Sequence, residues 1–314
     1  MKYNIFTLYP QIFRSFWETS LVARGIQKGI INKQEIDWRE EFGIGNYNQV
    51  DDKPYGGGSG MVLMTSPIYK AMKTNQALGG FSRNGFEKIV KNLDNKNNNQ
   101  AHNPEIKPNN PYFLDYWKQY KPKSVTISMT PKGYRFNQKI AEFMAAEFDT
   151  VNILCGRFEG FDARISKHID LELSIGGYVL NGGEVASMSV IESISRLVDG
   201  FITKNTSALH DSFSSGLNTY PEQKEFVIGK NRLKQIHQSN SNQESELRNK
   251  DYSNLFNQQD YLDNIQPYLE HPQYTRPLEF DRQEVPEVLL SGNHKKIQQF
   301  RQDWYKKTVE KSKK

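Results

Sequence analysis

Cysteine is almost absent from this sequence. The single cysteine, Cys155, excludes an internal disulfide bond and fits a reducing compartment. Because Cys155 ends an apolar run, we interpret it as a buried core residue, which is more common for a free cysteine than a nucleophilic role. No group of cysteine and histidine has the spacing of a zinc site, so we predict no metal-ligating residues.

Long hydrophobic runs are also missing. No stretch reaches the roughly 18 consecutive apolar residues that would indicate a membrane span. The first residues, MKYNIFTLYP, lack the hydrophobic region and cleavage site of a secretory signal. We therefore expect a cytoplasmic protein that does not involve a membrane.

Negative charge is scarce at one end of the chain. The whole chain has a formal charge of +5, but residues 294–314 alone hold eight Lys or Arg against one Asp and one Glu. Such a segment suits contacts with nucleic-acid phosphates. A run of charge can equally be a solvated face. Both interpretations stay open on charge alone.

Hydrophobic residues make up only 36% of the 314 residues, which is below the usual share. Two polar stretches stand out, residues 92–111 with many asparagines and residues 219–270 with Asn, Gln, Lys and Glu. We interpret both as surface insertions, because neither can bury much apolar area. The rest suits one large domain or two ordinary ones.

Apolar runs alternate with segments of helical periodicity. We expect strands at residues 3–8, 125–129 and 151–155. Apolar residues at helical spacing predict helices around residues 13–21, 136–144 and 190–198, and a last helix that begins after Asn293 as its N-cap. This alternation predicts an α/β fold with a parallel sheet.

Two glycine turns are the strongest sign of a ligand site. The run at 151–155 ends in Gly-Arg-Phe-Glu-Gly, and a second short apolar run at 178–180, also expected to be a strand, ends in Asn-Gly-Gly. Ligands of open α/β sheets lie outside the carboxyl ends of the strands, and glycine allows the backbone to approach a ligand closely. We predict one pocket built mostly from backbone.

Eight segments in chain order resemble one known family. They are DDKPYGGGSGM (51–61), TPKG (130–133), CGRFEGFDAR (155–164), SIGGYVLNGGE (174–184), SISR (193–196), DSFSSGL (211–217), HPQYTRP (271–277) and EVPEVLLSGNH (284–294). The chain resembles the bacterial TrmD-type tRNA (guanine-N(1))-methyltransferases of the trefoil-knotted (SPOUT) superfamily. The resemblance implies a knot at the end of the N-terminal sheet domain and a small, mainly helical C-terminal domain.

The resemblance further implies S-adenosylmethionine as methyl donor, bound by loops at residues 128–133, 156–160 and 178–183. The implied donor-binding residues are Ser128, Met129, Thr130, Pro131, Gly133, Gly156, Phe158, Glu159, Gly160, Ile175, Tyr178, Leu180, Gly182 and Gly183. The sequence departs from the family pattern at Phe158, Gly177, Asn181 and Ala186, which affects side-chain contacts more than a backbone pocket.

The catalytic residues that the resemblance implies are Asp211, as the general base for guanine N1, and Arg196, which stabilises O6 or orients Asp211. Without the resemblance, Asp211 and Ser212 are more simply interpreted as a helix N-cap. The implied substrate contacts are Ser212, Gly57, Gly58 and Arg276. The implied partners are tRNA, methylated at the guanosine 3′ of the anticodon, and a second copy in a homodimer; a response to Mg²⁺ is also implied.

We accordingly expect a methyltransferase domain at residues 1–199, a linker at 200–213 and a tRNA-binding domain at 214–314. Two other functions stay open. One is a related knotted methyltransferase that acts on another RNA position. The other is a non-catalytic RNA-binding protein that keeps the fold.

Overall fold

The computed structural model describes residues 1–79, 122–202, 271–301 and 303. The predicted polar insertion at 92–111, most of the predicted linker, the segment 219–270 and the candidate residues Asp211 and Ser212 lie outside the described residues. Within the described part, no helix is both long enough and apolar enough to cross a membrane.

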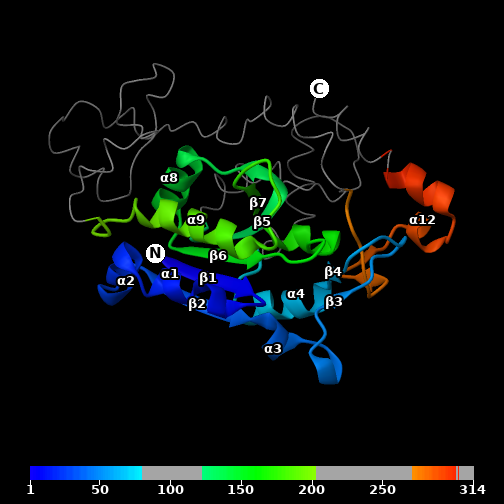
Figure 1. The fold of residues 1–314 in the computed structure, drawn as a ribbon, viewed down its shortest axis with the longest axis horizontal. Helices are drawn as coiled ribbons and strands as arrows, with labels where there is room; N and C mark the ends of the chain where they lie inside the picture. The colour runs from blue at the N-terminus through cyan, green and yellow to red at the C-terminus, as the bar shows by residue number, and fades with distance from the viewer. Residues whose placement is uncertain (80–121, 203–270, 302, 304–314) are drawn as a thin grey trace, which may run out of the picture.

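A five-stranded parallel sheet forms the centre of the molecule (Figure 1). Its strands lie side by side in the order β2 (Asn32–Asp37), β1 (Lys2–Thr7), β6 (Thr150–Cys155), β5 (Ser124–Arg135) and β7 (Leu171–Ser174). Each neighbouring pair is parallel. The predicted α/β fold with a parallel sheet is therefore confirmed, and the knot stays a prediction.

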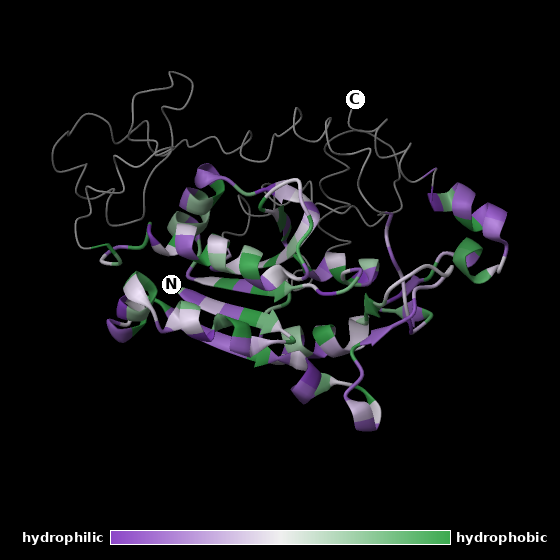
Figure 2. Ribbon diagram, in the orientation of Figure 1, coloured by the Kyte–Doolittle hydropathy of each residue, from purple (hydrophilic) through white to green (hydrophobic). Residues whose placement is uncertain are grey.

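Helices cover both faces of the sheet. Successive side chains of a strand point to opposite faces, so one strand can contribute to a core cluster on each side. On β1, Tyr3 and Ile5 belong to one core cluster, and Phe6 belongs to the other. The first cluster packs against η1 (Pro10–Phe13), α1 (Arg14–Trp17), α2 (Ser20–Gln27), α8 (Gln138–Glu147) and α9 (Gly183–Ser195). The second packs against α3 (Trp38–Phe42), α4 (Thr65–Thr74) and η3 (Ala163–His168). In Figure 2 hydrophobic segments of the central strands alternate with polar ones, and the apolar side chains of β6 are fully buried, as a sheet covered on both faces requires.

The predicted helices need small corrections. The helix expected around residues 13–21 is interrupted. α1, which follows η1 directly, ends at Trp17, and α2 begins at Ser20, which has a positive φ of 55°. Phe136 precedes α8, whose N-terminus is capped by the Asn137 side chain, which accepts from the Ile140 N–H at 3.0 Å. The predicted cap at Asn293 is confirmed, since its Oδ1 accepts from the Lys296 N–H at 3.2 Å.

The prediction of a strand at residues 178–180 is wrong. These residues form no strand, and Tyr178 and Val179 are 54% and 83% exposed. The strand is β7, a few residues earlier, where Leu171 and Leu173 enter the core and Glu172 points to the opposite face. A charged residue at the centre of β7 interrupts the apolar run that would have revealed the strand.

The expected loop at residues 130–133 lies inside β5 as an irregularity of the strand. The pairing of β5 with β7 shifts register between Met129 and Tyr134, so the intervening residues bulge out of the ladder. Gly133 lies so close to β7 that an added Cβ would be 2.4 Å from the Leu173 nitrogen. Only glycine allows this approach.

A short C-terminal segment packs beside the sheet domain. It contains the hairpin of β8 (Glu279–Phe280) and β9 (Gln283–Glu284), then α12 (Glu287–Leu290) and a helix from residue 294. Far earlier in the chain, η2 (Gly45–Tyr47) precedes the antiparallel pair of β3 (Asp51–Asp52) and β4 (Val62–Leu63), and Figure 1 draws the C-terminal segment beside β3 and β4.

A buried ion pair attaches this segment to the sheet domain. Arg164 and Asp162 are fully buried, and two guanidinium nitrogens of Arg164 each lie 2.9 Å from a carboxylate oxygen of Asp162. The Thr275 carbonyl accepts from Arg164 at 2.6 Å, and the Thr275 N–H donates to Asp162 at 2.6 Å. Both charges are therefore satisfied only when the C-terminal segment is in place.

We expect Arg164→Met to lower the free energy of unfolding by roughly 3–5 kcal/mol, because it leaves the buried Asp162 carboxylate without its counter-charge. Urea unfolding followed by circular dichroism measures this. The control is Lys33→Met, which removes a partly exposed pair with Glu35 and should cost at most about 1 kcal/mol. Equal effects of the two variants would contradict the assignment.

His168 should make stability depend on pH. Burial, helped by the charge of Lys167, lowers the pKa of His168 to about 4. Below the unfolded-state pKa of about 6.5, the unfolded chain binds a proton that the folded chain does not. Stability should therefore fall between about pH 6.5 and 4, by about 2 kcal/mol at pH 4.5 for this residue. Urea unfolding at pH 7 and pH 4.5 should show a smaller loss in His168→Gln than in the unaltered chain; the same loss in both would be the contrary result.

Candidate functional site

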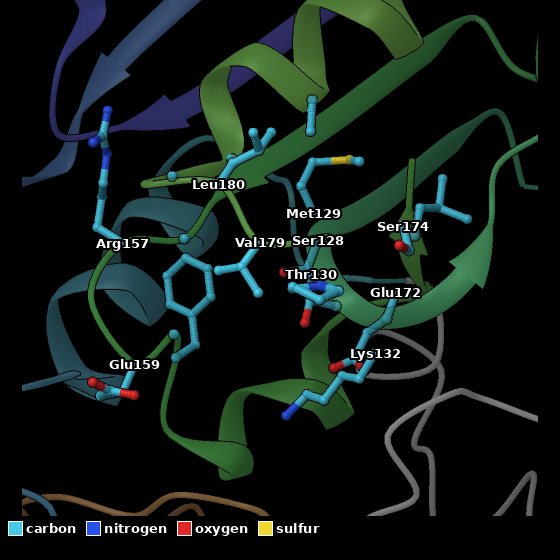
Figure 3. Close-up of a pocket in the computed structure, with 18 of the residues that line it drawn as sticks. Ser128, Met129, Thr130, Lys132, Arg157, Glu159, Glu172, Ser174, Val179 and Leu180 are labelled. Carbon is cyan, nitrogen blue, oxygen red and sulfur yellow. The ribbon is translucent and has the colours of Figure 1, made fainter. Parts of the chain in front are cut away.

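One pocket of about 550 Å³ opens at the carboxyl ends of β5, β6 and β7. This volume lies in the range of small-molecule sites. Its walls come from the β5 bulge, the turn after β6 and the segment between β7 and α9 (Figure 3). Thirteen of the fourteen residues implied as donor-binding, all but Gly133, line this pocket. Gly133 instead lies against the backbone of β7.

Glycines bring two of these walls together. The Gly183 N–H donates to the Gly156 carbonyl at 3.0 Å, and an added Cβ on Gly183 would be 2.8 Å from the Cys155 Cα. Gly160 has a φ of 90°, in the region that favours glycine. The two glycine turns therefore lie next to each other in one pocket, and a pocket built mostly from backbone stays a prediction.

An ion pair fixes the turn after β6 to the start of α9. Arg157 Nη2 lies 2.9 Å from Glu184 Oε2, and Arg157 Nε donates to Glu184 Oε1 at 3.1 Å. The Thr7 hydroxyl donates to the same Oε1 at 2.8 Å, and Arg157 Nη1 donates to the Asn181 carbonyl at 3.3 Å. Glu184 is buried, so this pair joins β1, β6 and α9 away from water.

Large apolar side chains surround the pocket mouth. Phe158, Tyr178, Val179 and Leu180 all line it, and all are exposed. Phe158 has a φ of 58°, which is uncommon for an aromatic residue and costs on the order of 1–3 kcal/mol. Such strain persists where the surrounding structure imposes it, and here it presents an aromatic ring at the entrance (Figure 3).

Four charged side chains line the pocket: Lys132, Arg157, Glu159 and Glu172 (Figure 3). Glu172 is only 6% exposed; its Oε1 accepts from the Ser166 hydroxyl at 2.9 Å, whereas its Oε2 has no hydrogen-bond partner. Burial raises the pKa of Glu172, and the nearby charge of Lys132 and the bond from Ser166 offset only part of this rise. The sequence analysis did not predict roles for Lys132 or Glu172.

The glycine-rich segment at 56–60 lies beside the pocket and the C-terminal helix. An added Cβ on Gly60 would be 2.2 Å from Glu159 Oε1. Arg301 donates to the carbonyls of Gly56 at 3.3 Å and Gly57 at 2.6 Å. Gly57 and Gly58, predicted to contact the substrate, are therefore close to the C-terminal segment and do not line the pocket.

Arg276 and Arg196 lie outside the pocket. Arg276 forms a two-point ion pair with Asp52, at 2.7 Å and 3.1 Å, and its side chain is 68% exposed. Arg196 is the C-cap of α9 and is half-buried. The other two predicted substrate-side residues, Asp211 and Ser212, lie outside the described residues. The predicted catalytic pair therefore stays a prediction.

Cys155 is a core residue. It is fully buried, its Sγ lies 3.2 Å from the Ser187 hydroxyl, and burial raises the pKa of its thiol. A buried thiol with a raised pKa is unreactive. The interpretation of Cys155 as structural is confirmed. Among the described residues, no group of three or more His, Cys, Asp or Glu could hold a metal ion, so the implied response to Mg²⁺ stays untested.

The site residues that no sequence pattern predicted have one property in common. Arg157, Glu184 and Glu172 are charged side chains whose partners are remote in sequence or on another strand. The available signal was the isolated glutamate between Leu171 and Leu173, because a buried position on a covered strand rarely holds a charge without a partner.

A parallel sheet with a glycine-lined pocket at the carboxyl ends of its strands defines the class of α/β proteins that bind small ligands at that edge. Comparison with known proteins narrows the class. The model of the family described as "tRNA (Guanine-1)-methyltransferase TrmD" matches residues 1–90, 109–241 and 253–314. The chain belongs to this family.

Individual relatives agree with the family model. A tRNA (guanine-N(1)-)-methyltransferase from Mycoplasma capricolum is 32% identical over 303 residues, covering 96% of this chain and 86% of the relative. One from Bacillus cereus is 31% identical over 302 residues, covering 96% and 85%. The solved structure of the tRNA (m1G37) methyltransferase from Aquifex aeolicus is 25% identical, covers 100% of this chain and 94% of that chain, and has a TM-score of 0.45.

Proposed function

We propose that this protein transfers a methyl group from S-adenosylmethionine to N1 of the guanosine 3′ of the anticodon in tRNA. The main support is that thirteen of the fourteen residues implied as donor-binding, all but Gly133, line one pocket in a chain that belongs to the tRNA (guanine-1)-methyltransferase family. The names of the relatives support the same substrate and reaction.

The pocket suits the proposed donor. Its volume of about 550 Å³ is that of a small-molecule site, and the glycines at 156 and 183 let two of its walls meet backbone to backbone, where a ligand can approach the chain closely. S-adenosylmethionine supplies an activated methyl group, so the protein's tasks are to align the acceptor and to remove its proton.

We assign the proton transfer to Asp211. Guanine N1 carries a proton, and a base within hydrogen-bond reach has to remove it as N1 becomes nucleophilic. The negative charge that develops is shared with guanine O6, where a fixed cation lowers the barrier. Arg196 is the proposed cation or the residue that orients Asp211, because a guanidinium stays charged and offers paired donors. Ser212 is proposed to hold the guanine.

The remaining proposals concern tRNA and assembly. The basic end of the chain would bind tRNA phosphates, with affinity that falls as salt rises. The described part of that end presents Lys295 and Lys296 as exposed side chains, beside the exposed Arg276. We propose a homodimer in which the segment that carries Asp211 completes the pocket of the partner. A tRNA-modifying enzyme of this kind would act in the cytoplasm.

Incubation with S-adenosylmethionine labelled on the methyl group tests the function. We expect label in unmodified tRNA that has guanosine 3′ of the anticodon, and none when adenosine replaces it, since adenosine lacks the N1 proton and O6. Label in both tRNAs would favour a related methyltransferase that acts on another position. If no label is transferred at any protein concentration, the hypothesis that remains is a non-catalytic RNA-binding protein.

The catalytic assignment predicts complementation between two inactive variants. We expect Asp211→Ala and Arg196→Ala each to lose turnover by at least about a hundredfold, the usual contribution of an acid–base group, and to bind the donor normally. If Asp211 acts on the partner's site, mixed dimers regain one intact site of two. Random exchange should then restore about a quarter of the unaltered activity. If Asp211→Ala retains turnover, Asp211 is not the general base. If mixing restores no activity, Asp211 acts on the site of its own subunit.

A further inference from the structure

Glu172 is a buried carboxylate that the fold does not satisfy. It lies at the centre of β7 opposite Ser128 of β5, and its Oε2 is without a hydrogen-bond partner although the residue is 6% exposed. A buried polar atom without a partner destabilises the folded chain. Because Glu172 lines the pocket, a ligand that donates a hydrogen bond there would remove this cost.

Lys132 is held beside Glu172 by the backbone. The bulge in β5 carries Lys132, and the next residue, Gly133, lies against β7 where an added Cβ would be 2.5 Å from the Glu172 carbonyl carbon. Figure 3 shows the two side chains next to each other in the pocket, with the amino end of Lys132 directed into the open space. The lysine charge also acts on the pKa of Glu172, which indicates that the groups are close.

The surrounding groups restrict the ligand. His271 also lines the pocket, but burial lowers its pKa, so it adds no positive charge near neutral pH. Glu159 on the other wall adds a second negative charge (Figure 3). A polyanion such as an RNA phosphate would meet two carboxylates there, and Arg157, which also lines the pocket, is already paired with Glu184. A group that carries an anion and a cation a few bonds apart matches Lys132 and Glu172 together.

We propose that Lys132 and Glu172 bind the amino-acid end of the methyl donor, with Lys132 on its α-carboxylate and Glu172 on its α-ammonium group. The inference rests on the proposed function, since the donor of that reaction carries a zwitterionic amino-acid group. It adds two side chains to a site whose other contacts are mostly backbone. In this arrangement the ammonium group supplies the missing partner of Glu172 Oε2.

The binding of three nucleosides distinguishes this role of Lys132 and Glu172 from contact with the sulfonium and from a structural role. S-adenosylmethionine has the zwitterion and a sulfonium, S-adenosylhomocysteine has the zwitterion and a neutral sulfur, and methylthioadenosine has neither charge. Calorimetric titration of the full chain should show that Glu172→Gln and Lys132→Met each weaken binding of the first two by about tenfold or more, as expected for loss of a charge-assisted hydrogen bond. Methylthioadenosine should bind the variants and the unaltered chain equally.

The matched controls are Glu279→Gln and Lys73→Met, which change the same residue types at exposed positions away from the pocket and should alter none of the affinities. Equal weakening of all three nucleosides would show a structural role and overturn the proposal. Weakening of S-adenosylmethionine alone would place Glu172 on the sulfonium, which also overturns it, as would unchanged binding of all three. If the unaltered chain binds none of the nucleosides, the proposed function itself fails.

Discussion

The ion pair between Arg157 and Glu184 is the interaction on which the pocket depends. It connects the turn after β6 with the first turn of α9, and the Thr7 hydroxyl ties the same carboxylate to β1. The glycines let these backbones touch directly, as the bond from the Gly183 N–H to the Gly156 carbonyl shows, but glycines have no side chains that could hold the two segments in register. A buried, multiply hydrogen-bonded charge pair can, because its geometry is specific and its rupture is costly.

The pocket thus combines two kinds of construction. Glycine turns bring polypeptide backbone to its walls, and four charged side chains, Lys132, Arg157, Glu159 and Glu172, line it as well. Backbone groups suit the recognition of a nucleoside because their positions are fixed by the strands themselves. Side-chain charges suit the discrimination of the groups attached to it. The exposed ring of Phe158 at the mouth shows that the chain accepts local strain to complete this edge.

The sequence predicted the sheet well where strands read as apolar runs. The run at 151–155 became β6 almost to the residue, because a central parallel strand is buried on both faces. The strand prediction failed at β7, where a single glutamate breaks the apolar run. It also failed at residues 178–180, where apolar side chains face the pocket mouth instead of the core. The glycine turns revealed where the pocket lies. The partners of Glu184 and Glu172 could not be predicted, because they depend on which strands become neighbours.

The buried ion pair of Asp162 and Arg164 has a consequence for which sequence changes the C-terminal segment can accept. It holds Thr275 of the C-terminal segment against the residues that follow the pocket turn, and His271 and Gln273, just before Thr275, form part of the pocket wall. The segment that leads into the basic end is thus also a wall of the small-molecule site. The two parts are not exchangeable modules: a chimera that took its C-terminal end from another family member would inherit a different pocket wall along with a different basic segment.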